Sequence, residues 1–217
     1  MHAFTDLATA AYCPRKLYYR WRDDDYDLPD RVEAVRRLAY RYEESLEDEV
    51  SLRDEPIAVT PTQYRANLGS AKARIDCWED LADPPARDVL LEGRDCRGIA
   101  HKLVGDPVVP TVVSTGEPPD RGVWEPQSVR ATAAAKALSW ERERTVDRAF
   151  VEYAAHGVIR EVTMTTRRKA SYRRALRTVQ TVDGPPPRLR DDARCTACEY
   201  QPRCGTKTRS LRSRLSL

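Results

Sequence analysis

The sequence contains no long apolar run, and nothing in it approaches the roughly 20 consecutive apolar residues that a membrane-spanning helix needs. Its first residues, MHAFTDLATAAYCPRK, also lack the basic region followed by an apolar region that marks a secretory signal peptide. Hydrophobic residues make up 41% of the chain and charged residues 33%, a balance typical of a soluble globular protein. We therefore expect a cytoplasmic protein without a membrane partner, and the 217 residues suit one large domain.

Lysine is scarce beside arginine, and acidic residues are scarce in the C-terminal quarter. Residues 167–217 hold 14 Lys or Arg against 4 Asp or Glu, a net charge of +10, whereas residues 1–166 hold 23 against 30, a net charge of −7. A basic quarter is the electrostatic pattern expected for a polyanionic partner. A solvated helix face followed by a disordered basic tail, residues 211–217, is the other interpretation, and charge alone leaves both open.

Periodicity and turn residues predict a mixture of helices and strands. Residues 1–22, 31–50 and 126–146 have helical patterns, and a basic helix, KASYRRALRTVQTV, should end at the prolines that follow it. The runs GIAHKLV and VVPTVVS flank a Gly-Asp-Pro turn and predict a β-hairpin over 98–114. RAFVEYA and VIREVTMT predict two more strands around Gly157. Short runs such as PIAVTP indicate further β-structure between the 31–50 helix and the hairpin. The expected fold class is α/β, with a mixed sheet built around the hairpin.

Cysteine is also uncommon, with six in the chain, and three of these fall within ten positions near the C-terminus. Cys195, Cys198 and Cys204 have the spacing C-x2-C-x5-C, which suits thiolate ligands but supplies only three of the four that a soft tetrahedral centre takes. In a reducing cytoplasm such cysteines are ligands or buried thiols more often than disulfides. We expect Cys77 and Cys96, which stand alone, to be ordinary buried or half-buried thiols.

Cys13 is the candidate fourth ligand, because it precedes Pro14, which fixes the backbone at a helix break. Pairing Cys13 with the C-terminal three closes a loop of 182 residues, and the entropy of closure grows only slowly with loop length. Zinc and an iron–sulfur cluster both accept four cysteines, although zinc ribbons usually present two C-x2-C pairs. The spacing therefore favours a cluster and leaves zinc open.

Five stretches, taken in order along the chain, resemble one family of proteins. They are LATAAYCPRKLYYR, VLLEGRDCRGIAHKLVGDPVVPTVVSTGEPP, VWEPQSVRATAAAKALSWER, FVEYAAHGVIREVTMT and GPPPRLRDDARCTACEYQPRCG. Together they resemble the iron–sulfur branch of the restriction-endonuclease-like PD-(D/E)xK nucleases, and most closely the CRISPR-associated exonucleases of the spacer-acquisition machinery. The resemblance implies a nuclease-like core and a [4Fe–4S] cluster that joins residues 1–22 to residues 188–210, held by Cys13, Cys195, Cys198 and Cys204.

The same resemblance places the family's catalytic motif on residues that do not supply its chemistry. Such a nuclease needs a carboxylate on one hairpin strand, and a Glu and a Lys two residues apart on the next, to hold divalent cations and orient water. The Asp position falls on His101, the Glu position on Val112 and the Lys position on Ser114. The family's upstream His falls near Glu43, and the glutamine of its packing helix near Arg130. Valine cannot bind a hard cation, so nuclease activity should be lost or impaired.

Three functions remain open from the sequence. The first is a DNA-binding iron–sulfur protein that has lost catalysis and works as a structural or recruiting subunit with proteins of CRISPR adaptation or DNA repair. The second is an active DNA exonuclease whose Mg²⁺ or Mn²⁺ is held in a rearranged site by Glu43 and His101. Against this, Glu43 can be a solvated helix carboxylate and His101 a satisfied strand histidine. The third is a redox-sensing cluster protein that binds no DNA.

The basic stretch TTRRKASYRRALR favours the two DNA-binding functions over the third. Single strands would be preferred if Tyr172, or the aromatic residues of KLYYRW, stack on bases. No pattern predicts the oligomeric state. The candidate DNA contacts are Arg167, Arg168, Lys169, Arg173, Arg174 and Arg177.

Overall fold

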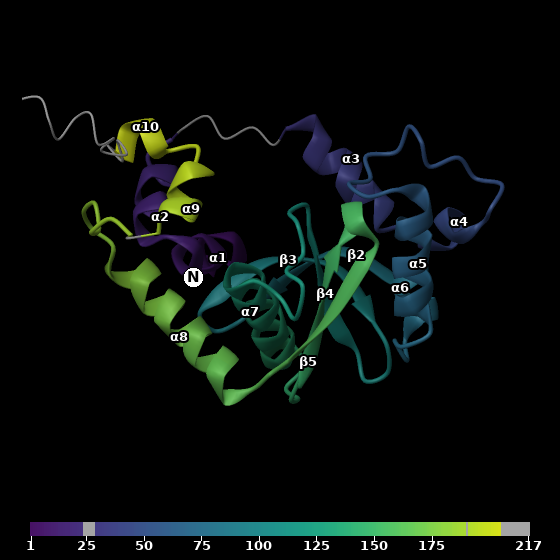
Figure 1. The fold of residues 1–217 in the computed structure, drawn as a ribbon. Helices are drawn as coiled ribbons and strands as arrows, with labels where there is room; N and C mark the ends of the chain where they lie inside the picture. Colours follow the sequence, from purple (N-terminus) through teal and green to yellow (C-terminus); the bar gives the residue numbers. More distant parts are fainter. Residues whose placement is uncertain (24–28, 190, 205–217) are drawn as a thin grey trace, which may run out of the picture.

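The computed structural model describes residues 1–23, 29–189 and 191–204, and these residues form an α/β structure around a six-stranded mixed sheet (Figure 1). The order along the sheet is β1-β3-β4-β5-β6, and β2 also pairs with β3. The pairs β1–β3 and β4–β5 are parallel, and the other three are antiparallel. The strands are β1 (His2–Ala3), β2 (Ala86–Glu92), β3 (Cys96–Val104), β4 (Val109–Ser114), β5 (Arg148–Tyr153) and β6 (Val158–Thr163).

The central strand β3 has a gap along one of its edges. β2 pairs with it along the first edge, from Arg97 to Leu103. The second edge is shared by two strands, because β1 pairs with β3 only at Cys96 and Arg97 and β4 pairs only with residues 102–104. Within the described structure, residues 98–101 therefore have no strand partner on this second edge. The sheet is open between β1 and β4 at that point.

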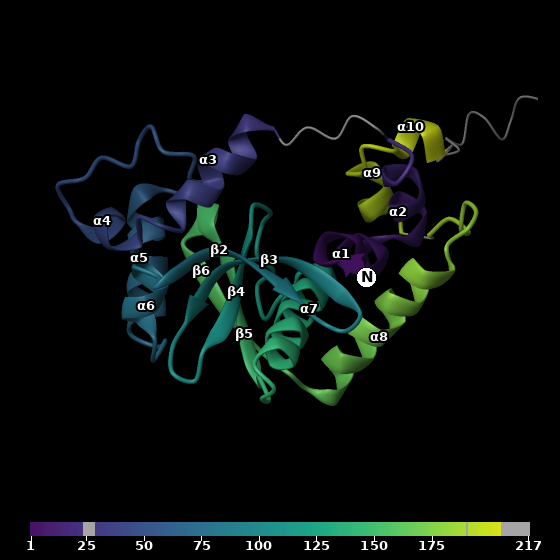
Figure 2. The ribbon, with the colours of Figure 1, turned by 180° about the vertical axis from the view of Figure 1, so that it is seen from behind.

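Helices cover both faces of the sheet (Figures 1 and 2). The alanine-rich α7 packs on the sheet together with α1 and α8, and a Cβ atom on Gly93 would lie 2.9 Å from the Ala137 Cα, so the two backbones need a glycine here. The segment α3–α6 lies on the other side. The helices are α1 (Phe4–Tyr12), α2 (Pro14–Arg20), α3 (Asp30–Leu38), α4 (Tyr42–Leu46), α5 (Pro61–Lys72), α6 (Trp78–Ala82), α7 (Glu125–Glu141), α8 (Thr166–Thr181), α9 (Asp192–Thr196) and α10 (Gln201–Cys204).

Most of the elements predicted from local patterns are confirmed. The predicted hairpin is β3 and β4, in which Lys102 pairs with Thr111 and Val104 with Val109. The strands around Gly157 are β5 and β6, and the glycine between them has a positive φ of 62°, a conformation that side chains with a Cβ rarely adopt. The predicted helix from residue 126 is α7, and the basic helix is α8. The mixed α/β fold class is thereby shown.

Two long helices of the prediction are each divided in the structure. The first breaks at Cys13, where Pro14 begins α2, as expected for a residue without a backbone N–H. The second, predicted over 31–50, is wrong as a continuous helix, because the chain turns between α3 and α4. At this turn the Ala39 carbonyl accepts a hydrogen bond from the Lys102 ammonium. Tertiary contact with β3 thus overrides the apolar periodicity.

The strand structure predicted around PIAVTP is also wrong. Residues 55–60 belong to no strand, and Ala58 donates a backbone hydrogen bond to Ala155. The helix α5 follows at once, since the Thr60 hydroxyl caps the Gln63 N–H and Pro61 occupies the first turn. Sequence patterns missed α5 and α6, whereas β2 lies in the stretch before the hairpin where β-structure was expected.

The two ends of the described chain lie side by side (Figures 1 and 2). The Tyr12 hydroxyl donates to the Arg194 carbonyl at 3.0 Å, and Lys16 forms an ion pair with Glu199 at 2.9 Å. The predicted basic tail, 211–217, lies outside the described residues, as do 190 and 205–210 of the predicted cluster-binding segment. Among the described residues, no helix is both long enough and apolar enough to cross a membrane.

Candidate functional site

The four candidate ligand cysteines line one cavity between the two ends of the described chain. Cys13 lies at the break between α1 and α2, Cys195 in α9, Cys198 just after it and Cys204 in α10. All four thiols are half-buried and free. The structure therefore brings together the four residues that the sequence predicts as one ligand set.

Local structure explains how each cysteine reaches this cavity. Cys13 has an extended backbone, with φ −163° and ψ 117°, between the end of α1 and the start of α2. Its side chain lines the cavity at this break. On the opposite side, the Asp191 carboxylate caps α9 by accepting from the Arg194 N–H at 3.1 Å. The short helices α9 and α10 then wrap the C-terminal three cysteines around the cavity.

The four neighbouring thiols of this cysteine cavity would repel one another as thiolates, which favours a positively charged group beside their sulfur atoms. Burial raises the pKa of the Cys195 thiol, and the neighbouring thiols of Cys13, Cys204 and Cys198 raise it further. The thiols line one cavity, yet within the described part of the chain no three Cys, His, Asp or Glu side chains are placed to hold a single metal ion. Arginine and lysine side chains surround the same cavity and would offset the negative charge of four thiolates, namely Arg15, Lys16, Arg188 and Arg194.

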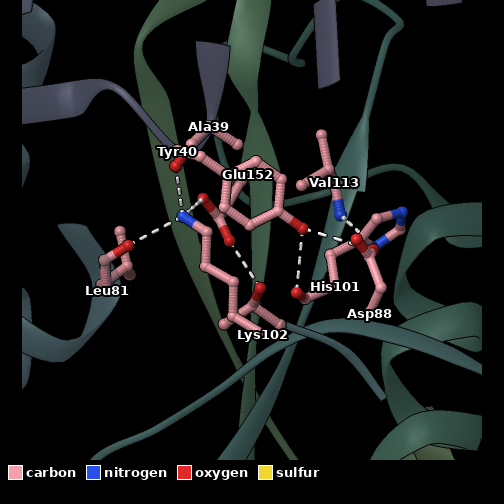
Figure 3. Close-up of polar contacts among 9 residues, drawn as sticks. Ala39, Tyr40, Leu81, Asp88, His101, Lys102, Val113 and Glu152 are labelled. Atoms are coloured by element: carbon pink, nitrogen blue, oxygen red, sulfur yellow. Dashed lines mark hydrogen bonds and ion pairs between the residues drawn. The ribbon is translucent and has the colours of Figure 1, made fainter. Parts of the chain in front are cut away.

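The three positions of the altered catalytic motif meet at the gap between β1 and β4. His101 is only 3% exposed, and its Nδ1 accepts a hydrogen bond from the Val113 N–H at 3.0 Å (Figure 3). Burial lowers the pKa of His101 to about 2, and the charges of Arg130 and Arg36 act in the same direction. The imidazole is therefore neutral, and its Nδ1 lone pair is occupied by the backbone. This matches the satisfied strand histidine that the sequence left open.

Val112 and Ser114 lie on β4 and line the cavity beside the first turn of α7. Val112 is buried, and the Ser114 hydroxyl accepts long hydrogen bonds, each of 3.4 Å, from the Gly116 N–H and the Gln127 amide. The predicted glutamine position near Arg130 is thus three residues from a real glutamine, which faces the cavity. The three motif positions thus line two neighbouring cavities, and they supply no carboxylate.

Glu43 does not join His101. Its carboxylate accepts hydrogen bonds from the Lys72 ammonium at 2.9 Å and from the Trp78 indole at 2.5 Å. Burial tends to raise the pKa of Glu43, but the bonds from Lys72 and Trp78 outweigh it, so the pKa is lowered. Glu43 lies outside the described cavities that contain His101 and Ser114. The structure therefore does not assemble the rearranged cation site that the sequence allowed.

A buried ion pair on the other face of β3 escaped the sequence analysis. The Lys102 ammonium lies 2.7 Å from the Glu152 carboxylate, and both side chains are 0% exposed. Lys102 also donates to the carbonyls of Ala39 and Leu81, so Figure 3 shows it pointing away from His101. Thr111 donates to the second oxygen of Glu152. A charge inside an apolar strand pattern is the one sequence signal for such a pair.

This buried network is satisfied by protein groups and serves the fold. Burial lowers the pKa of Lys102, whereas the Glu152 carboxylate raises it. The Tyr40 and Tyr42 rings lie 5.3 and 4.6 Å from the ammonium, a distance at which aromatic faces attract a cation. The network joins β3 to β4, β5 and the α3–α6 segment, so it positions the sheet edge on which His101 lies.

The predicted DNA contacts lie on α8, and most of them face solvent. Arg168 is half-buried and donates to the Thr163 carbonyl, and Arg174 pairs with Glu125 at 2.8 Å. Tyr172 is 2% exposed and donates to the Cys96 thiol, so the idea that it stacks on bases is wrong. Of the KLYYRW aromatics, Trp21 is 43% exposed. The exposed basic residues are Arg167, Lys169, Arg173, Arg174 and Arg177.

The other two cysteines fit their predicted roles as ordinary thiols. Cys96 is buried against α7, and burial raises its pKa. Cys77 is half-buried, and burial together with the nearby Asp76 raises its pKa to about 11. Neither lines the cysteine cavity.

A scan against models of known protein families finds no match to this chain, and a search of curated proteins finds none either. The family resemblance therefore rests on the motifs and their order.

Proposed function

We propose that this chain is a DNA-binding iron–sulfur protein that resembles the CRISPR-associated exonucleases but no longer hydrolyses DNA. The observation that carries the proposal is the shared cavity of Cys13, Cys195, Cys198 and Cys204, contributed by the two ends of the chain. Thiolates are the usual ligands of [4Fe–4S] clusters, and no carboxylate or imidazole of the described residues lines this cavity in competition. The donor set therefore fits the group.

These four cysteines would hold the cluster, which when bound would link the two ends of the chain through metal–sulfur bonds. Because Cys13 and Cys195 are 182 positions apart in the sequence, the energy of binding would become folding energy. The direct contacts of Tyr12 and Lys16 with the C-terminal segment already bring the two halves together. These contacts support the proposal, because they hold together the two segments that carry the four cysteines.

The residues at the altered motif support a loss of hydrolysis. Mg²⁺ and Mn²⁺ prefer carboxylate and other oxygen ligands, and two-metal hydrolysis needs carboxylates on adjacent strands. Among the described residues, Asp88 is the one carboxylate that lines either cavity at this gap, and its side chain is exposed. Arg36 and Arg130 line both cavities. A cluster of positive charges opposes the binding of a divalent cation.

DNA binding is proposed for the exposed basic face of α8. This face carries positive charge without base-reading geometry, so contacts to phosphates would dominate, and affinity would fall steeply with salt. In this proposal the protein works as a structural or recruiting subunit in CRISPR adaptation or DNA repair. Its partners would be DNA and the other proteins of that process.

The test is a purification without oxygen, followed by metal analysis and a nuclease assay. About four irons per chain with a brown colour are expected for a four-cysteine cluster. Labelled single- and double-stranded DNA should stay intact with Mn²⁺ or Mg²⁺. Stoichiometric zinc without visible absorption would overturn the cluster. Chelator-sensitive cleavage that disappears in Glu43→Ala or His101→Ala would instead establish an active exonuclease with a rearranged site.

A further inference from the structure

We propose that the gap between β1 and β4 is a phosphate-binding site, formed by Arg36 and Arg130 together with Arg20, in the place where the resemblance would put a metal ion. The inference deepens the proposed function by naming the group that this part of the protein recognises. It rests on that function only for the source of the phosphate, and its first test uses inorganic phosphate alone.

The space for such a ligand consists of two neighbouring cavities, of about 250 and 390 Å3. They share Thr5, Arg36 and Arg130 in their walls, so one set of side chains faces both. Ligand pockets for small molecules usually measure about 300–1,000 Å3, so these volumes suit a phosphate group with the sugar that carries it. They lie on the unpaired edge of β3, beside His101 and Ser114.

Arg36 and Arg130 lack the negative partners that half-buried guanidinium groups usually have. Among the described residues, no carboxylate forms an ion pair with Arg36 or Arg130. The Nε atoms of both are inaccessible to solvent and have no hydrogen-bond partner. Arg130 makes one long contact, from Nη1 to the Val113 carbonyl at 3.4 Å, and Arg20 donates to the Thr9 hydroxyl. The positive charges of Arg36 and Arg130 therefore have no carboxylate partner within the described part of the chain.

The charges of the three arginines also repel one another, and this repulsion is visible in the pKa of Arg130. Burial, together with the charges of Arg36 and Arg20, lowers the pKa of Arg130 to about 10. Asp88, the one carboxylate that the described residues contribute to either wall, is exposed and accepts a hydrogen bond from the Tyr40 hydroxyl at 3.3 Å. An anion bound between Arg36 and Arg130 would remove the repulsion and fill the open donors.

Neutral groups in the wall complete a site for oxygen atoms. Gln127 and Pro126 belong to the first turn of the 17-residue α7, whose N-terminus favours negative charge. The hydroxyls of Thr5 and Ser114 line the cavity, and either can donate to a phosphate oxygen. Arginine forks match phosphate oxygens in pairs, and this favours phosphate over a carboxylate ligand.

The experiment uses the full, cluster-loaded chain and a matched pair of arginine variants on α3. Arg36→Gln removes a charge from the cavity. Arg37→Gln removes the same charge from the next residue, which is 67% exposed and faces solvent. Arg130→Gln is the second cavity variant. Titration with inorganic phosphate should raise the midpoint of heat unfolding of the wild type and of Arg37→Gln, but not of Arg36→Gln or Arg130→Gln.

Binding of two oligonucleotides distinguishes the possible sources of the phosphate, which are a strand end, the DNA backbone and free phosphate. A thymidine oligomer with a 5′-phosphate and one with a 5′-hydroxyl are compared, and each cavity variant should weaken binding about tenfold or more, the effect of one charge-assisted hydrogen bond. A loss confined to the phosphorylated oligomer assigns a strand end, and an equal loss for both assigns a backbone phosphate. Stabilisation by inorganic phosphate without any change in oligomer binding assigns free phosphate.

The proposal is overturned if inorganic phosphate stabilises none of the proteins and the cavity variants bind both oligomers as the wild type does. It is equally overturned if Arg37→Gln loses binding as much as Arg36→Gln. Failure of the proposed function gives different results. The purified protein would contain no iron, or its affinity for DNA would not change when the charges on α8 are reversed. If Arg36→Gln unfolds, Arg130→Gln and the phosphate titration of the wild type still decide.

Discussion

Breaking the buried pair of Lys102 and Glu152 tests how the sheet is joined to the α3–α6 segment. The ammonium and carboxylate lie 2.7 Å apart with 0% exposure. Lys102→Met keeps an unbranched side chain and removes the charge. The Glu152 carboxylate would then stay buried while it still accepts from the Thr111 hydroxyl, and the Ala39 carbonyl would lose its donor.

The expected loss of stability is large, because a buried charge would be left without compensation. Removing one partner of a buried ion pair destabilises proteins by about 3–5 kcal/mol. In a chain of this length, each kcal/mol lowers the midpoint of heat unfolding by about 2–4 °C. Lys102→Met should therefore unfold about 6–20 °C below the wild type. Replacing Glu152 with Met as well should recover part of the loss, since apolar residues often substitute for a buried pair.

The assay is circular dichroism of cluster-loaded protein, heated without oxygen. Lys72→Met is the matched control, because it removes the same charge from an ion pair with Glu43 in which the two side chains are 45% and 47% exposed. Exposed pairs contribute about 0–1 kcal/mol, so this variant should unfold within a few degrees of the wild type. A Lys102→Met midpoint equal to that of Lys72→Met would refute the buried pair as a source of stability.

Three further predictions test the site. Cys13→Ala and Cys198→Ala should lose the iron and the visible absorption, whereas Cys77→Ala keeps both; retention of iron in the first two would reject the ligand set. Because the pKa of His101 is about 2 in the folded chain and about 6.5 when unfolded, the unfolded chain binds the extra proton between these values, and stability falls as the pH drops below about 6.5. At pH 5 the wild type should have lost about 2 kcal/mol of its unfolding free energy in this way, and His101→Gln should not lose it. The midpoint of heat unfolding of His101→Gln should therefore rise relative to that of the wild type between pH 7 and pH 5. If the midpoints of the two proteins change in parallel with pH, the lowered pKa of His101 is contradicted. On α8, reversing the charges of Arg167, Arg173 and Arg177 should weaken DNA binding and reduce the slope of log affinity against log salt concentration by about two to three. The matched control reverses three exposed arginines elsewhere, Arg53, Arg94 and Arg142, and should change neither quantity. Equal effects of the two sets on DNA binding would argue against α8.

Those elements that depend on neighbouring residues could be predicted from the amino-acid sequence. Pro14 removes a backbone donor, so the helix break at Cys13 was predictable. Alternation and turn residues likewise predicted the β3–β4 hairpin, and the α7 and α8 patterns predicted their helices. The cysteine spacing and the motif order also grouped Cys13 with Cys195, Cys198 and Cys204, which line one cavity in the structure.

The contacts between these elements could not be predicted, because they depend on how the chain folds in three dimensions. The turn at Ala39, the burial of Tyr172 and the pairing of Lys102 with Glu152 arise from contacts between distant segments, which no local pattern records. Arg36 and Arg130, 94 positions apart, are ordinary helix residues in the sequence. They meet because β1 and β4 leave one edge of β3 open, and that gap turns two unremarkable arginines into the walls of a charged cavity.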